Sequence, residues 1–248
     1  MIARFCAAWR FLTVLPAPGH LGTEEQDLAR SLVFFPVVGV VIGCAMAVIA
    51  WLVWPLLPAL PAAAMMVFLL LAISGGFHLD GLADSADGLL SARPKEQILA
   101  IMRDSRIGTM GAAALVMVLL TKTVALGSLP QAQAASAVFL MAVAGRCLMV
   151  LMMAFLPYAR GREGRAALFY ETASEEKKIV YLTGIVLYSG CWYAGGGSGL
   201  AAGAAALVAM LLFAGLCRAK IGGATGDTLG ATCELTETVI ALALSAGW

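Results

Sequence analysis

The chain has 248 residues, of which 61% are hydrophobic and 12% charged, with a mean hydropathy of +0.92 and a formal net charge of +1. So little polar surface excludes an ordinary soluble globular protein, and the near-neutral charge gives no indication of nucleic-acid binding. The composition therefore indicates a protein embedded in a lipid bilayer.

The first 30 residues predict a helix that lies on the membrane surface. Their apolar stretch, FCAAWRFLTVLPAPG, is too short to cross a bilayer and lacks a clear small-residue cleavage site. Arg4 and Arg10 interrupt its aromatic and aliphatic side chains, a pattern typical of an interfacial amphipathic helix. A signal peptide is the alternative interpretation.

Residues 31–248 predict an all-α polytopic bundle of about six to seven transmembrane helices, so that residues 1–248 form one integral-membrane domain. Continuous apolar runs of roughly 20 residues are the length of a membrane-crossing helix, and they exclude the weak alternation of a barrel. The runs lie at 31–56, 58–77, 109–128, 134–157, 179–197 and 199–217, and a seventh, shorter one fills 238–248.

The basic residues predict the orientation of the bundle. If residues 1–30 are cytoplasmic and seven segments cross, the outer loops WPLLPALPA, SLPQAQA and GGGSG carry no basic residue. All of the 16 basic residues except Lys122 and Arg146 then fall in inner segments, as the positive-inside rule requires. The two exceptions are expected to face the bundle interior, where they contact substrate or pair with a buried acceptor.

The first of two glycine-led acidic segments is HLDGLADSADG, residues 78–88. Asp80, Asp84 and Asp87 are spaced i, i+4 and i+7, which places them on one face of a helix. Three like charges on one face favour a divalent cation, and oxygen ligands without sulfur favour Mg²⁺ or Mn²⁺ completed by phosphate oxygens. A solvated helix face is the alternative. His78 has three possible roles: base, ligand or interfacial residue.

The second acidic segment is GGATGDTLGATCELTE, residues 222–237, which the predicted topology brings to the same cytoplasmic face. Its acidic residues Asp227, Glu234 and Glu237 offer further ligands or a general base. Gly226 and Gly230 allow backbone amides to approach phosphate closely, although tight helix packing is an alternative reason for glycine in a membrane. Glycine pairs precede Asp80 and Asp227 at the same interval, which is a weak hint of an internal repeat.

The segment RDSRIGTMG, residues 103–111, lies between the acidic segments. Arg103 and Arg106 are one helical turn apart and, with Gly108 and Gly111, suit an anionic group such as a pyrophosphate. A positive-inside anchor is the ordinary alternative for the two arginines.

Together these runs, with RFLTVLPAP and SLVFFPVVG near the N-terminus, resemble the cobalamin synthase family over essentially the whole chain. The resemblance implies a magnesium-requiring, multi-pass transferase of the cell inner membrane, and the topology predicted from the basic residues places its active site on the cytoplasmic face. Members attach alpha-ribazole, or its 5′-phosphate, to adenosylcobinamide-GDP with release of GMP.

The resemblance also places the family's motifs on numbered residues. Its acidic, arginine-glycine and late motifs fall on Asp80, Asp84, Asp87, Arg103, Asp104, Arg106, Gly108, Gly111, Gly226, Asp227, Gly230 and Glu234. We expect the first three aspartates and Asp227 to hold Mg²⁺, the arginines and glycines to bind phosphates, and Asp84 with Glu234 or His78 to act in catalysis.

Two other functions fit parts of the pattern. CDP-alcohol phosphotransferases also place aspartates at the cytoplasmic ends of membrane helices, but this chain lacks the alanine-arginine pair after their first Asp-Gly. A cation-coupled transporter would hold ions at the midplane, whereas these acids fall at span ends beside arginines. Segment 158–178 is interpreted as a lid or a docking surface for soluble pathway enzymes, and a homo-oligomer is also considered.

Overall fold

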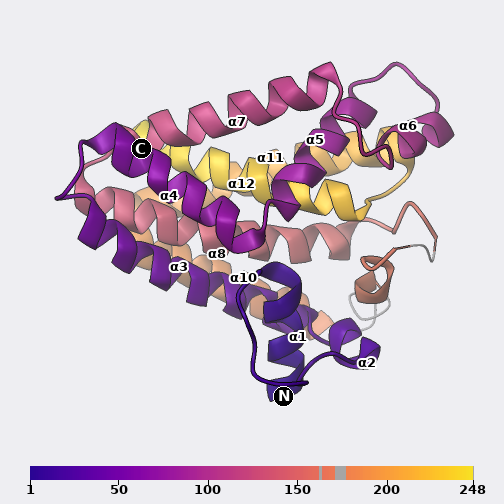
Figure 1. Ribbon diagram of the computed structural model, residues 1–248, viewed down its shortest axis with the longest axis horizontal. Coiled ribbons are helices and arrows are strands. Elements are labelled where there is room, and N and C mark those ends of the chain that lie inside the picture. The colour runs from indigo at the N-terminus through magenta and orange to yellow at the C-terminus, as the bar shows by residue number, and fades with distance from the viewer. Residues whose placement is uncertain (162–163, 171–176, 248) are drawn as a thin grey trace.

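The computed structural model describes residues 1–161, 164–170 and 177–247, and within them it contains helices and no strand. Figure 1 shows the long helices running roughly along the longest axis, with α1 (Ile2–Leu12) and α2 (Glu25–Ala29) at one corner below them. The predicted all-α bundle is confirmed.

The remaining helices follow in chain order. They are η1 (Leu32–Phe34), α3 (Phe35–Val53), α4 (Ala59–Ser74), α5 (Phe77–Leu89), α6 (Lys95–Ile101), α7 (Thr109–Gly127), α8 (Gln131–Phe155), α10 (Lys177–Gly195), α11 (Gly197–Ile221) and α12 (Gly226–Ser245).

Helix α8 forms the centre of the bundle, packing against α3, α10 and α12. Small residues on α3 let the two backbones approach closely: a Cβ added to Gly43 would lie 2.8 Å from the carbonyl oxygen of Phe139. Without a hydrophobic driving force between helices in lipid, such close contact is a main source of association. The core is thus built around α8.

Four described helical segments are long and apolar enough to cross a membrane: Leu32–Val53, Thr109–Gly127, Gln131–Phe155 and Gly197–Ile221. Helices α4 and α5 would together form a fifth span, bent by 92°. By length and composition, the described residues thus supply four spans, or five with the bent pair, beside the six to seven expected from the sequence. Helix α12 carries three acidic residues, and α10 begins with two lysines and contains several polar residues, so neither is among the four.

The late acidic segment is part of a longer helix than the sequence indicated. The predicted short span 238–248 continues back to Gly226, so that the motif forms the first turns of α12. Thr225 caps this helix reciprocally with Thr228, an arrangement that satisfies its first free amides. The acidic side chains of the motif therefore have fixed positions on α12.

The N-terminal segment contains the expected helix, α1, while its position on a membrane surface stays a prediction. Arg10 donates hydrogen bonds to the carbonyl oxygens of Ala17 and Leu21, which folds the following loop back on α1. The amide of Val14 then donates to the carbonyl oxygen of Ile73 at 2.8 Å. This bond fixes α1 beside the junction of α4 and α5.

Candidate active site

The two acidic helices cross in close contact, as the sequence predicted. A Cβ on Gly81 of α5 would lie 2.6 Å from the carbonyl oxygen of Asp227 on α12. One on Gly230 would lie 3.1 Å from the Cα of His78. Gly230 therefore serves helix packing here, and the contact brings together two segments about 150 residues apart in the chain.

The expected helical face of α5 is confirmed, because Asp80, Asp84 and Asp87 all lie within Phe77–Leu89. Asp80 is exposed and Asp84 is half-buried. The main charges that act on Asp84 are three carboxylates, those of Asp80, Asp227 and Asp87, and one guanidinium, that of Arg160. We name Asp80, Asp84, Asp87 and Asp227 the acidic cluster, and its charge is mostly uncompensated.

Asp87 has a further role that the sequence did not indicate. Its two carboxylate oxygens accept hydrogen bonds from the amides of Gly108, at 2.7 Å, and Gly111, at 2.8 Å. An added Cβ on either glycine would lie 2.4 Å from that carboxylate. Asp87 thus caps the N-terminus of α7, where a negative charge is favourable, and the two glycines contact it directly.

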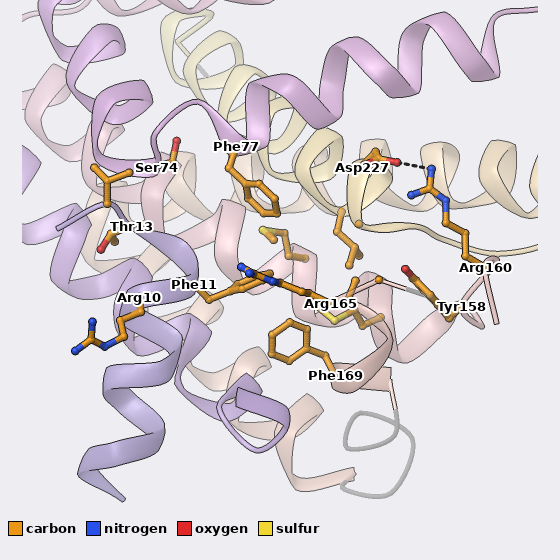
Figure 2. A pocket seen from close by; sticks show the side chains of 17 residues that line it. Arg10, Phe11, Thr13, Ser74, Phe77, Tyr158, Arg160, Arg165, Phe169 and Asp227 are labelled. Carbon is orange, nitrogen blue, oxygen red and sulfur yellow. Dashed lines mark ion pairs between the residues drawn. The ribbon is translucent and has the colours of Figure 1, made fainter. Parts of the chain in front are cut away.

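Arg160 forms an ion pair with Asp227, with 2.9 Å between Nη2 and Oδ2 (Figure 2). Backbone bonds hold this arginine in place: Ala224 donates to Pro157, and Ala159 donates to Ala224. Segment 157–160 is therefore fastened to the linker between α11 and α12.

The segment from Arg103 to Arg106 is not helical, so the expectation that these arginines are one helical turn apart is wrong. It forms the loop between α6 and α7, where both side chains are exposed. Arg106 pairs with Asp104 at 2.6 Å, and this contact lowers the pKa of Asp104 to about 2. The loop turns there because Asp104 also accepts a hydrogen bond from the amide of Arg106.

The two mid-span cations face the bundle interior, as expected, and their partners are carboxylates of α12. Lys122 lies 2.7 Å from both Glu234 and Glu237, and Arg146 pairs with Glu237. All four side chains are buried, so we name them the buried ion network. Glu234, which was expected to act as a base, is enclosed by this network.

His78 is also enclosed, with 1% of its surface exposed. Its Nε2 has no hydrogen-bond partner within the described part of the chain. The structure thus separates His78 from solvent. Neither of the two candidate bases, His78 and Glu234, lies among the residues that line the cavity beside the acidic cluster.

A cavity of about 410 Å³ lies beside the acidic cluster (Figure 2). Helices α1, α4, α5, α8 and α12 and the segment after α8 all contribute to its wall. The wall combines aromatic and sulfur-containing side chains with a few charged ones: Phe11, Phe77, Met149, Met153, Tyr158, Phe169, Arg10, Arg160, Arg165 and Asp227. Sequence reasoning missed this cavity, because its lining residues are scattered over the chain.

As they stand, no three histidine, cysteine or acidic side chains within the described residues converge closely enough to hold a metal ion. The acidic cluster still offers only hard oxygen donors and an excess of negative charge. That donor set suits Mg²⁺, which usually binds one or two carboxylates and completes its shell with water and phosphate.

A polytopic helix bundle with an acidic cluster between two crossing helices, bordered by Arg160, defines a multi-pass membrane protein with a carboxylate-rich site. The chain belongs to the cobalamin-5-phosphate synthase family, whose model matches residues 4–245.

Two relatives show the extent of the similarity. The adenosylcobinamide-GDP ribazoletransferase of Klebsiella pneumoniae strain 342 is 39% identical over 256 residues, which cover 98% of this chain and 100% of the relative. The enzyme of the same name from Citrobacter koseri is 37% identical over 244 residues, covering 97% and 98%. No solved structure matches the chain significantly.

Proposed function

We propose that this protein transfers the adenosylcobinamide-phosphate moiety of adenosylcobinamide-GDP to alpha-ribazole or its 5′-phosphate, releasing GMP, with Mg²⁺ as cofactor. The full-length match to relatives of that name supports the reaction. The observation that carries the assignment to a site is the crossing of α5 and α12, which joins Asp84 and Asp227 in one acidic cluster.

The transfer needs one bond made and one broken. A ribose hydroxyl oxygen of the acceptor bonds to the phosphorus next to cobinamide, and the bond from that phosphorus to the bridging oxygen breaks. The bridging oxygen leaves with GMP, and the hydroxyl proton passes to a carboxylate of the acidic cluster. Asp84 is our candidate for this role, since His78 and Glu234 are enclosed.

The acidic cluster suits the donor pyrophosphate only when a cation lies between them, since carboxylates and phosphates repel. We propose that Mg²⁺ binds one or two carboxylates of the set Asp80, Asp84 and Asp227, with water and phosphate oxygens completing its shell; Asp87, already used by α7, remains a weaker fourth candidate. Mg²⁺ bound there would supply charge neutralisation at the leaving phosphate. Arg103 and Arg106, exposed on the loop before α7, are proposed to grip the outer phosphate oxygens.

We also propose that the acidic cluster lies on the cytoplasmic side of the inner membrane. Basic residues gather where α6 lies, at the right of Figure 1: Lys95 begins α6, while Arg218 and Lys220 end α11. This agrees with the positive-inside rule.

The test is GMP release and cobamide formation by the full chain in liposomes, with adenosylcobinamide-GDP, either acceptor form, and Mg²⁺ or EDTA. Asp84→Asn is expected to lose activity by at least about 100-fold, while Glu96→Gln, an exposed acid on α6, keeps it. A folded wild type that is inert with both acceptors would refute the reaction. Screens of CDP-alcohol substrates and ion flux would follow.

A further inference from the structure

We propose that the cavity beside the acidic cluster is the binding site of the acceptor, with the base of the nucleoside against its aromatic wall and Arg165 at the 5′-phosphate. This inference rests on the proposed function and specifies where one of its two substrates binds.

The size of the cavity selects the acceptor over the cobinamide. Its volume of about 410 Å³ lies in the range of small-molecule pockets, roughly 300–1,000 Å³. A nucleoside monophosphate fits such a space, whereas a corrin macrocycle with its amide arms is far bulkier.

The aromatic wall suits a flat apolar base. Phe11 packs edge-on against Phe77 at 5.6 Å and against Phe169 at 4.9 Å between ring centroids. The base of ribazole, a dimethylbenzimidazole, has no hydrogen-bond donor of its own when attached to the sugar. Guanine, by contrast, presents several donors and acceptors that would be left unpaired against phenylalanine and methionine. The wall therefore favours ribazole over the guanosine of the donor.

Arg165 is the cation most suited to the phosphate. Figure 2 shows its side chain reaching toward the middle of the cavity, with the guanidinium drawn between the rings of Phe77 and Phe169. The other two arginines are engaged: Arg10 donates to backbone carbonyl groups, and Arg160 pairs with Asp227. Among the described residues, no ion-pair partner of Arg165 is found.

The position of Asp227 connects the cavity to the chemistry. Asp227 lines the cavity and also acts electrostatically on Asp84. An acceptor in the cavity thus presents its ribose next to the carboxylates that are proposed to hold Mg²⁺ beside the pyrophosphate.

The test compares Arg165→Gln, Val14→Trp and matched controls in the liposome assay. Val14 is 65% exposed at the cavity wall, so a larger side chain there narrows the cavity without disturbing the core. Arg93→Gln, an exposed arginine outside the cavity, and Leu15→Trp, an exposed neighbour that does not line it, are the controls. Acceptor affinity is also measured directly by equilibrium dialysis, without donor.

Arg165→Gln is expected to raise the KM and Kd for ribazole 5′-phosphate about tenfold or more, the effect of one charge-assisted contact. It should leave those for unphosphorylated ribazole and the KM for adenosylcobinamide-GDP unchanged. Val14→Trp should weaken the binding of both acceptor forms, and the two control variants should weaken the binding of neither.

Three results would overturn the inference. Acceptor constants unchanged in both variants would place the acceptor elsewhere. If the variants selectively weakened inhibition by the product GMP, the cavity would bind the guanosine of the donor instead. If Arg165→Gln weakened the binding of ribazole and of ribazole 5′-phosphate equally, the proposed contact between Arg165 and the phosphate would be refuted. The proposed reaction fails separately, when the wild type binds ribazole in dialysis yet makes no cobamide.

Discussion

Gly81 lies so close to Asp227 that a Cβ on the glycine would be 2.6 Å from the aspartate's carbonyl oxygen. The contact is with backbone, which cannot rotate away as a flexible side chain could. The relative position of the two acidic helices therefore depends on a hydrogen atom at residue 81.

Gly81→Ala is expected to separate α5 from α12 and to lower activity by at least about tenfold, since small misplacements at a reacting centre are costly. The matched control is Gly215→Ala on α11, where an added Cβ meets no atom within 4 Å. That change should keep activity and stabilise the helix by up to about 1 kcal/mol. Activity and thermal unfolding in detergent are measured for both variants. If Gly81→Ala and Gly215→Ala had the same activity and stability, the close contact at Gly81 would be contradicted.

Asp87→Ala is expected to lower the free energy of unfolding by about 1–2 kcal/mol, because it removes the cap of α7. Asp84→Ala should reduce activity without a comparable loss of stability, since no hydrogen bond to its side chain is found among the described residues. Detergent melting curves and GMP release, measured on both variants, distinguish the two roles. If Asp84→Ala unfolded as easily as Asp87→Ala, the distinction would be lost.

Lys122→Met should be among the most destabilising changes in the chain, because it leaves Glu234 and Glu237 facing each other with Arg146 alone. Removing one partner of a buried ion pair typically costs about 3–5 kcal/mol. The double variant Lys122→Met/Glu234→Gln restores equal numbers of opposite charges and is expected to recover much of that loss. Thermal unfolding of Lys122→Met, Glu234→Gln and the double variant gives the coupling free energy of the two residues. Purely additive effects on stability would refute the network.

Asp104→Asn is expected to leave thermal stability unchanged, because surface ion pairs contribute little and the Arg106 side chain is 87% exposed. Its pKa of about 2 keeps Asp104 charged at any working pH. The stabilising effect of this depressed pKa is present above the ordinary value of an aspartate and is lost only as the pH falls toward 2. Activity ratios of variant to wild type should therefore be constant from pH 5 to 9; a ratio that changes with pH would contradict this.

Much of the architecture could be predicted because helix length and charge placement are local properties of the sequence. The apolar runs indicated a helical bundle, and the spacing of Asp80, Asp84 and Asp87 indicated one helical face. The first glycines of the two repeated pairs are structurally alike, since Gly75 and Gly222 both end a helix with a left-handed conformation, whereas of the second glycines Gly76 has a positive φ and Gly223 does not. Each is followed closely by an acidic helix.

Contacts between distant segments could not be read in the same way. The partners of Lys122 and Arg146 follow from charge balance, since two buried cations need two anions and Glu234 and Glu237 are three residues apart on one helix. That signal was present but pointed equally to catalysis. The lid or docking role of segment 158–178 stays a prediction, in part because residues 162–163 and 171–176 lie outside the described ranges.

Asp227 belongs to the acidic cluster and also lines the cavity. Two substrates that meet at such a residue can be bound at the same time in separate sites. The group then passes directly from one to the other, and no covalent enzyme intermediate is needed. Steady-state kinetics in such a case are sequential: double-reciprocal plots at several fixed concentrations of the second substrate intersect, whereas a ping-pong enzyme gives parallel lines. The placement of one carboxylate thus sets the form of the rate equation.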